Sequence, residues 1–255
     1  MLIAERMRPL RIRSHPTLKR FTSNVLLALL GLMASRLISA PLTEWAGSTQ
    51  GQWSFGIKAI VGFIALDATL WIWHLLNHKV PFLWRFHQVH HSDLNMDAST
   101  ALRFHFGELA LSGLFRTAQV LILGVSPALV IFFEVSVTAS AMFHHSNFRI
   151  PLAFERYLVW FIVTPRMHGV HHSVVQNETD SNYSAIFPIW DKLAGTLKLN
   201  IPQAEVHIGV PYLDNFQETQ FPAILWLPFR KLKPRLFPNG TTPSRTLISQ
   251  EVFPN

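Results

Sequence analysis

Apolar residues fill long segments of this chain, and polar residues gather between them. Residues 21–40 and 55–73 are long enough, at about 1.5 Å per helical residue, to cross a hydrocarbon layer of about 30 Å. The first segment carries Arg36 near its far end, and the second carries only Lys58 and Asp67 as charged residues. The pattern therefore predicts transmembrane helices near residues 21–40 and 55–73, with a turn at residues 41–53 between them.

A third apolar region is interrupted at its centre by turn-forming residues. Residues 109–123 and 128–143 are apolar, and Gly124, Ser126 and Pro127 lie between them. Each arm is somewhat short for a full span, so we expect a helical hairpin near residues 109–143 that enters the membrane and returns to the same side. Arg116 and Glu134 lie one in each arm and could pair across it.

The distribution of charge along the chain distinguishes between two classes of protein that share this composition. The 255-residue chain is 49% hydrophobic, 15% charged and has a formal net charge of +7, which fits a membrane protein or a basic nucleic-acid binder. Its basic residues cluster within residues 6–20 and 230–235, flanking the apolar segments, as the positive-inside rule describes. We therefore expect no nucleic-acid partner, a basic cytoplasmic tail at residues 1–20 and a Pro-rich cytoplasmic segment at residues 201–255.

The N-terminal region also resembles a signal peptide, because a basic stretch precedes an apolar run. That run is long and has no clear small-x-small cleavage site before a polar start. A retained first membrane helix is the better interpretation.

Eight of the thirteen histidines recur at helical spacing, as one pair four residues apart and two triplets with the pattern H-x2-HH. They are His74, His78, His87, His90, His91, His168, His171 and His172. Residues three and four apart lie on one helical face, so each triplet is expected to direct three imidazoles to one point. This is the geometry of a metal site.

Nitrogen and oxygen must supply the metal ligands, because the chain has no cysteine. Imidazole suits Zn, Cu, Fe and Ni, and eight histidines exceed the capacity of one ion, so two metals are predicted. Two zinc ions would suggest hydrolysis, although the H-E-x-x-H motif is absent from the sequence. Two irons would suggest oxygen activation at C–H bonds. A bis-histidine haem would need single histidines on facing helices.

Two local features bear on these clusters. Asp67 lies seven residues before His74 on nearly the same helical face, so it could orient that histidine or form a structural ion pair. Thr164 and Pro165 are typical of an N-cap and a first helical residue, and they predict the start of the helix that presents the last triplet.

The three clusters resemble the histidine boxes of the sterol desaturase and fatty acid hydroxylase superfamily of integral-membrane di-iron oxygenases. Residues 100–105 (TALRFH), 145–147 (HSN), 180–183 (DSNY) and 190–196 (WDKLAGT) are also similar to stretches of that superfamily. The resemblance covers about residues 67–196. It implies an all-α, polytopic membrane helical bundle with a cytosolic, histidine-rich helical cap, here an oxygenase domain at residues 21–200.

The resemblance also implies roles for particular residues. Carried over position by position, it makes the eight clustered histidines metal ligands, and it adds His145, which resembles a further histidine between the second and third boxes. Four more residues are candidates to orient the ligands or, for His105, to face the substrate: Asp67, His105, Glu108 and Asp180.

The implied activity is that of an O2-dependent lipid hydroxylase or desaturase. Such an enzyme would hold two iron ions, which zinc can replace, and would use O2 as co-substrate with electrons from a reductase or small carrier protein. Its substrate would be a membrane lipid such as a sterol, a fatty acyl chain or an ether lipid. The outline is closer to the sterol desaturase and alkylglycerol monooxygenase branches than to a fused fatty acid 2-hydroxylase, because no haem domain precedes the boxes. We expect an integral, multi-pass protein whose termini and metal site are cytoplasmic.

Two other functions remain open on the residues. One is a catalytically silent membrane protein that binds metal or acts as a scaffold. The other is a di-zinc membrane hydrolase. Intact histidine clusters argue against the first.

Overall fold

The computed structural model describes residues 1–49 and 56–245, and over these residues the regular structure is helical apart from two isolated β-bridges. The elements are α1 (Leu2–Met7), α2 (Thr17–Ala34), η1 (Ser35–Ser39), α3 (Ala40–Ser48), α4 (Ile57–Lys79), α5 (Pro81–His91), η2 (Ala98–Leu102), α6 (Phe106–Leu123), α7 (Pro127–His144), α8 (Leu152–Leu158), α9 (Pro165–His171), α10 (Gln176–Thr179), α11 (Ile189–Ala194), η3 (Gln203–Glu205), η4 (Phe216–Thr219) and η5 (Ala223–Phe229). The predicted all-α class is confirmed.

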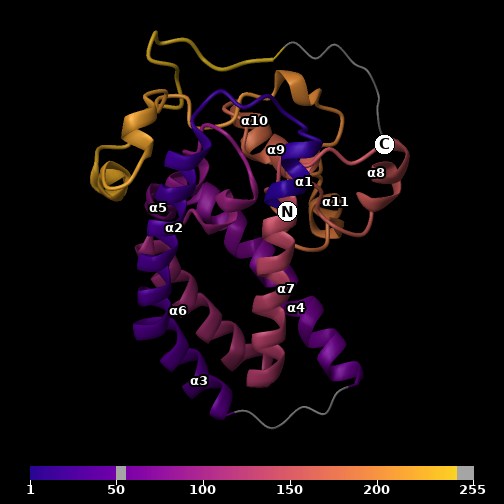
Figure 1. The fold of residues 1–255 in the computed structure, drawn as a ribbon. Coiled ribbons are helices and arrows are strands. Elements are labelled where there is room, and N and C mark those ends of the chain that lie inside the picture. Colours follow the sequence, from indigo (N-terminus) through magenta and orange to yellow (C-terminus); the bar gives the residue numbers. More distant parts are fainter. Residues whose placement is uncertain (50–55, 246–255) are drawn as a thin grey trace.

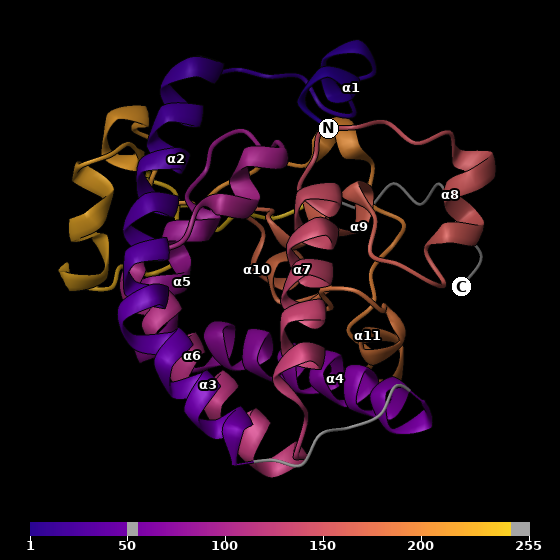
Figure 2. The ribbon, with the colours of Figure 1, turned by 60° about the horizontal axis from the view of Figure 1, so that its bottom comes forward.

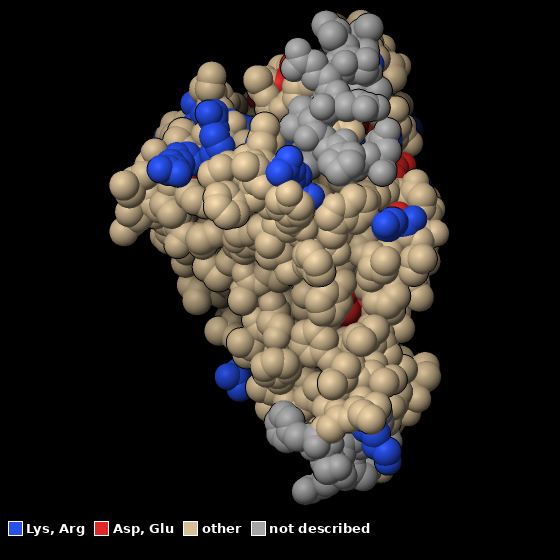
Figure 3. Space-filling model, turned by 90° about the vertical axis from the view of Figure 1, so that its right-hand side faces the viewer, with Lys and Arg blue, Asp and Glu red and all other residues tan. Residues whose placement is uncertain are grey.

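Four helical segments are long and apolar enough to cross a membrane. They are Thr17–Ser48, Ile57–Lys79, Phe106–Leu123 and Pro127–His144. Figures 1 and 2 show them extending from one end of the molecule, while the short helices α1, α5 and α8–α11 gather at the other end as a cap. In Figure 3 a broad belt with few charged residues separates the charged cap from the charged lower end. This arrangement supports the predicted membrane bundle.

The first span is longer than the sequence indicated. The helix does not stop at residue 40 but runs through α2, η1 and α3 to Ser48, so most of the turn predicted at residues 41–53 is helical and its residues 50–53 lie outside the described part. Pro41 cannot donate a backbone hydrogen bond, and the π-helical turn Ser35–Ser39 immediately precedes it. The local change of helical pitch lets the chain continue past the proline.

The second span is also shifted relative to the prediction. It was expected at residues 55–73 and is observed as α4, Ile57–Lys79, while residue 55 lies outside the described part. The extra turns at its C-terminal end carry His74 and His78. These histidines are therefore part of the spanning helix.

The two arms of the predicted hairpin are helical in the structure, as α6 and α7. Gly124 ends α6 in the left-handed conformation with φ 65°, and the Ser126 hydroxyl accepts a hydrogen bond from the Leu129 N–H at 3.4 Å. Arg116 Nε donates to Glu134 Oε1 at 2.7 Å, as the sequence suggested. Each arm has 18 residues, hence about 27 Å of helix, so both are long enough to count as spans in their own right.

The first 20 residues, predicted as a basic tail, make buried contacts with the cap. Glu5 is buried and accepts hydrogen bonds from the N–H groups of Ala98 at 3.2 Å and Asn147 at 2.8 Å. Arg11 Nη2 donates to the Pro165 carbonyl at 2.7 Å. The basic N-terminal segment is therefore packed into the cap, directly against the start of α9.

The described part of the Pro-rich C-terminal segment also packs closely. Ile224 and Leu227 of η5 are buried in a core cluster with Leu27 of α2 and Trp84 of α5. Residues 246–255 of the predicted segment lie outside the described part. Within the described part, η5 packs against α5.

A buried ion cluster joins the first span to the loop after α5. The Arg20 guanidinium donates to both carboxylate oxygens of Asp93, at 2.6 and 2.7 Å, and to Asp97 at 2.8 Å, and its side chain is fully buried. Burial opposes ionisation of Asp93, but Arg20 and Arg103 outweigh it and hold the pKa of this carboxyl below its usual range. The loop is thereby fixed to the membrane helix.

Replacing Arg20 should strongly destabilise the protein. In Arg20→Met two buried carboxylates lose their guanidinium partner, which costs about 3–5 kcal/mol. Thermal unfolding of the purified chain in detergent, followed by tryptophan fluorescence, measures the loss. Lys19→Met is the matched control, because Lys19 is exposed one residue earlier. Equal melting temperatures for the two variants would contradict the role of the ion cluster.

Candidate metal centre

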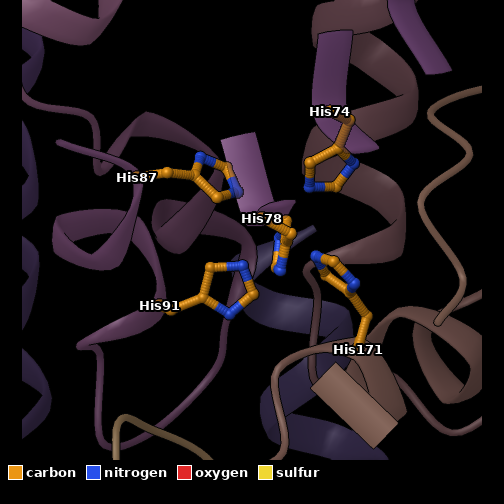
Figure 4. Close-up of side chains that lie close together, drawn as sticks. All are labelled: His74, His78, His87, His91 and His171. Atoms are coloured by element: carbon orange, nitrogen blue, oxygen red, sulfur yellow. The ribbon is translucent and has the colours of Figure 1, made fainter. Parts of the chain in front are cut away.

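The nine histidines predicted as ligands lie together in the interior of the cap, in two groups. Within each group, one ring nitrogen per histidine lies within 4.8 Å of the others. The five-histidine cluster contains His74, His78, His87, His91 and His171 (Figure 4). The four-histidine cluster contains His90, His145, His168 and His172. Each group could hold a metal ion.

The spacing of each H-x2-HH triplet suggested that its three rings point at one place. In the structure the rings of each triplet are divided between the two clusters. On α5, His87 and His91 belong to the five-histidine cluster and His90 to the four-histidine cluster. Adjacent residues on an α-helix point about 100° apart, so the HH pair of a triplet is directed toward two separate sites. The triplet at α9 divides in the opposite sense, with His171 in the five-histidine cluster. Each triplet therefore contributes histidines to both clusters.

Local structure places these rings as the sequence predicts. Pro81 begins α5, and the Thr164 hydroxyl caps α9 by accepting from the Met167 N–H at 3.4 Å. His145 is the C-cap of α7 and lies beside the rings of α5 and α9. The ends of three helices, α5, α7 and α9, thus meet at the clusters.

Five of the rings are oriented by an oxygen acceptor at Nδ1. These contacts are His74 to Tyr183 O at 2.6 Å, His87 to Glu108 Oε1 at 2.7 Å, His90 to Arg103 O at 3.2 Å, His145 to Ala141 O at 2.8 Å and His171 to Ser181 O at 2.7 Å. An oxygen acceptor requires the proton on Nδ1, so Nε2 carries the lone pair. That lone pair faces the cluster, which is how protein metal sites orient their histidines.

The inward-facing nitrogens have no protein donor. Both ring nitrogens of His78, His91 and His172 are buried without a hydrogen-bond partner among the described residues. The same is true of Nε2 of His74, His87 and His171. In the four-histidine cluster, His145 Nε2 lies 3.0 Å from Nε2 of both His90 and His168. Buried acceptors that converge in this way fit a cation between them.

Burial affects the protonation of at least four of the buried rings. Burial lowers the pKa of His145 to about 4. Burial, followed by the proximity of other imidazoles, lowers the pKa of His91, His171 and His172 well below the usual histidine range. Neutral imidazole is the form that binds metal, so the site needs no deprotonation before a cation enters.

Two of the predicted orienting carboxylates contact histidines. Glu108 on α6 accepts from His87 Nδ1 and is buried. Asp180 Oδ1 lies 3.6 Å from His78 Nδ1, and its other oxygen accepts from Lys79 at 2.9 Å. Both carboxylates serve the five-histidine cluster.

The other two predicted residues have different roles. Asp67 accepts from the Trp190 indole at 2.7 Å and from the Phe187 N–H at 3.2 Å, so it joins α4 to the segment around α11 and does not orient His74. His105 caps α6, since its Nδ1 accepts from the Gly107 N–H at 3.0 Å. Its Nε2 faces the Leu225 carbonyl at 3.3 Å, away from the clusters.

Sequence reasoning missed the groups that orient most of the rings, because they are backbone carbonyls. Tyr183 illustrates this, since its carbonyl binds His74 while its fully buried ring packs against the rings of His74, His78 and His171. The only available signal was the DSNY stretch at residues 180–183. His144, next to His145, is buried with its ring 4.1 Å from that of His168 but lies outside both clusters.

Comparisons with known proteins agree with this site. The fatty acid hydroxylase family model matches residues 59–196, which include all nine histidines. Human cholesterol 25-hydroxylase is 32% identical over 138 residues, covering 53% of this chain and 49% of the relative. Ornithine lipid hydroxylase OlsE of Rhizobium tropici is 30% identical over 163 residues (62% and 47%), and alkylglycerol monooxygenase of Xenopus tropicalis is 29% identical over 143 residues (56% and 30%). The chain spans about half the length of the first of these curated relatives. No solved structure matches the chain significantly.

Substituting two adjacent histidines should remove two different ions. We expect the intact chain to bind about two metal ions, and His90→Ala and His91→Ala each to lose about one. The double variant should then retain almost none. Metal content is measured by mass spectrometry after anaerobic loading with Fe(II), or with Zn(II) as a redox-inert probe. If the double variant lost no more metal than either single variant, the triplet would form one site and the division into two clusters would be wrong.

Removing the acceptor of His87 should weaken metal binding without a loss of fold. In Glu108→Leu the His87 ring loses the partner that fixes its tautomer, so we expect an affinity about 10–100-fold lower at the five-histidine cluster. Glu108→Gln keeps an acceptor but not the charge and should lie between this variant and the wild type. Glu44→Gln, at an exposed carboxylate on α3, is the control. Competition with a chromogenic chelator gives the affinities, and identical values for all four proteins would refute the role of Glu108.

Proposed function

The chain belongs to the fatty acid hydroxylase family, and from this membership we propose that it is a membrane oxygenase that uses O2 and external electrons to oxidise a C–H bond of a lipid. One observation carries the proposal. Two adjacent histidine clusters lie where four apolar helices enter the cap, and their inward-facing nitrogens lack protein donors. A metal pair at that position would be within reach of a membrane substrate.

We further propose that each cluster holds one iron ion. The nine histidines already named would be the ligands. When bound, two irons supply the redox chemistry that converts O2 into an oxidant strong enough for an unactivated C–H bond. The protein contributes neutral, pre-oriented imidazoles and a buried site. Glu108 supplies negative charge beside the five-histidine cluster, where it offsets that of the cations.

The substrate would enter from the membrane side. Within the clusters only His74 is partly exposed, and it lies on the spanning helix α4. Phe104 is also partly exposed and stacks on His90 with ring centroids 4.4 Å apart. A hydrocarbon chain can approach these two apolar ring faces without crossing the polar cap surface. Sterols, fatty acyl chains and ether lipids all satisfy this requirement, and the relatives named above act on lipids.

Electrons would have to come from a partner, because the described residues contain no further cofactor-type site. A reductase or small carrier protein could approach the cap on its solvent side. We propose that this side and both termini are cytoplasmic, in keeping with the basic residues at 6–20 and 230–235.

The alternative of a di-zinc hydrolase has less support. Metal-assisted hydrolysis needs a carboxylate that can take a proton from the metal-bound water. Glu108 accepts from His87 Nδ1, and Asp180 is paired with Lys79, so neither carboxylate is placed to act as that base. A silent scaffold that binds metal would use the same converging ring nitrogens, so turnover distinguishes it from the oxygenase.

Oxygen incorporation into lipid tests the proposed function. The iron-loaded chain in nanodiscs made from a total lipid extract should, with a chemical reductant and 18O2, consume O2 and give a lipid product that His171→Ala does not form. One 18O atom per product identifies a hydroxylase, and loss of two hydrogens without 18O identifies a desaturase. Metal-dependent lipid cleavage without O2 consumption would support the hydrolase, and metal binding with no product of either kind would support the scaffold.

A further inference from the structure

An ion pair lies inside the membrane-spanning part of the hairpin. Arg116 is seven residues before the end of α6 at Leu123, and Glu134 is seven residues after the start of α7 at Pro127. Seven residues correspond to about 10 Å of helix, so the pair lies about 10 Å from the hairpin tip. Ionisable side chains at such depth are costly and generally mark a function.

The two partners are held very differently. Arg116 is 11% exposed: it donates to Glu134 and to Gln119 Oε1 at 2.6 Å, and its guanidinium lies 4.8 Å from the Phe133 ring centroid. Gln119 in turn donates to Thr69 of α4. Glu134 is 51% exposed, and its Oε2 has no hydrogen bond within the described part of the chain. Nη2 of Arg116 likewise has no partner there. Arg116 thus keeps an unused N–H and Glu134 an unused carboxylate oxygen.

The helix face that carries Glu134 leads to the metal centre. Thr138, Ala141 and His145 lie four, seven and eleven residues further along α7, and eleven residues bring the chain back to within about 20° of the same direction. Thr138 is exposed and Ala141 partly exposed, so protein does not cover this face. His145 belongs to the four-histidine cluster. The ion pair and His145 are thus about 16 Å apart along one helix face, which is exposed as far as Ala141 and buried at His145.

The two arms of the hairpin diverge away from its tip. In Figures 1 and 2, α6 and α7 meet at the hairpin tip and diverge toward the cap in a V. The Arg116–Glu134 contact joins its two arms near the closed end. On the α6 arm, Ser112 is partly exposed and bound to the Trp73 indole at 3.0 Å. Small side chains therefore line the arms between the ion pair and the clusters.

We propose that Arg116 and Glu134 form a subsite for the hydroxyl group of the substrate lipid, which lies along α7 with the carbon to be oxidised at the clusters. This rests on the proposed function. A hydroxyl suits the pair because it donates to the free oxygen of Glu134 and accepts from the free N–H of Arg116. Burying a hydroxyl that is hydrogen-bonded costs little, whereas moving a phosphate headgroup to this depth would bury a further charge. The site therefore favours lipids with a single hydroxyl over phospholipids.

Photolabelling of the full chain in nanodiscs tests this subsite. Two probes are used, a long-chain primary alcohol with a diazirine next to its hydroxyl and the same alcohol with the diazirine about 16 Å away along its chain. The first should label residues near Arg116 and Glu134, and the second residues 138–145, in both cases saturably. Arg116→Leu with Glu134→Leu should reduce saturable labelling about tenfold through loss of the two hydrogen bonds.

Two further variants separate recognition from stability. Exchange of the pair, Arg116→Glu with Glu134→Arg, keeps a donor beside an acceptor and should retain labelling within about twofold. Phe132→Leu, on the exposed face of α7, is the control and should behave as wild type. Loss of labelling in the exchanged pair, undiminished labelling in the double leucine variant, the same pattern for both probes, or no saturable labelling of the wild type would each overturn the proposal.

The test is independent of catalysis, because photolabelling needs neither metal nor turnover. The expected pattern on a chain that consumes no O2 would support the subsite and count against the oxygenase. An active oxygenase with no such pattern would overturn the subsite and leave the proposed function standing.

Discussion

Convergence of nine imidazoles in a buried space is the constraint on which the rest of the structure depends. Neutral rings that turn their lone pairs toward one another repel, and no described side chain donates a proton between them. Without cations this packing would destabilise the fold, because each buried acceptor that has no donor costs free energy. With cations it becomes favourable, because metal binding adds directly to the stability of the folded state. The cap is thus best understood as a shell built around two charges.

That shell is fixed from outside by groups that never enter the clusters. Arg103 shows how: its side chain donates to the Val89 carbonyl and to Asn24 of α2, both at 2.9 Å, while its own carbonyl faces His90. Arg20 ties the same loop to the first span through Asp93. A shift of the first span would therefore be transmitted to His90 through Arg20 and Arg103. The position of the site relative to the membrane is set by these polar contacts as much as by apolar packing.

Helical periodicity and histidine spacing predicted the all-α class, the hairpin and the set of histidines that meet. They could not predict which group each buried polar side chain binds, because that group is distant in sequence. Asp67 binds Trp190, 123 positions away, and Glu5 is buried because two backbone N–H groups from separate segments reach it. The division of each triplet follows from the 100° step between adjacent residues. It becomes visible only when α5 and α9 are seen to face each other.

The choice of ligands has an electrostatic consequence for the substrate. Nine neutral imidazoles cancel none of the charge of two divalent cations, and of the nearby carboxylates Asp93 and Asp97 are already paired with Arg20. Asp180 is likewise paired with Lys79 and Arg235, so Glu108, beside the five-histidine cluster, remains to offset it. A loaded site would therefore be strongly positive where the membrane helices meet the cap. An uncharged hydrocarbon can lie against such a site with no electrostatic penalty, whereas a cationic headgroup would be repelled.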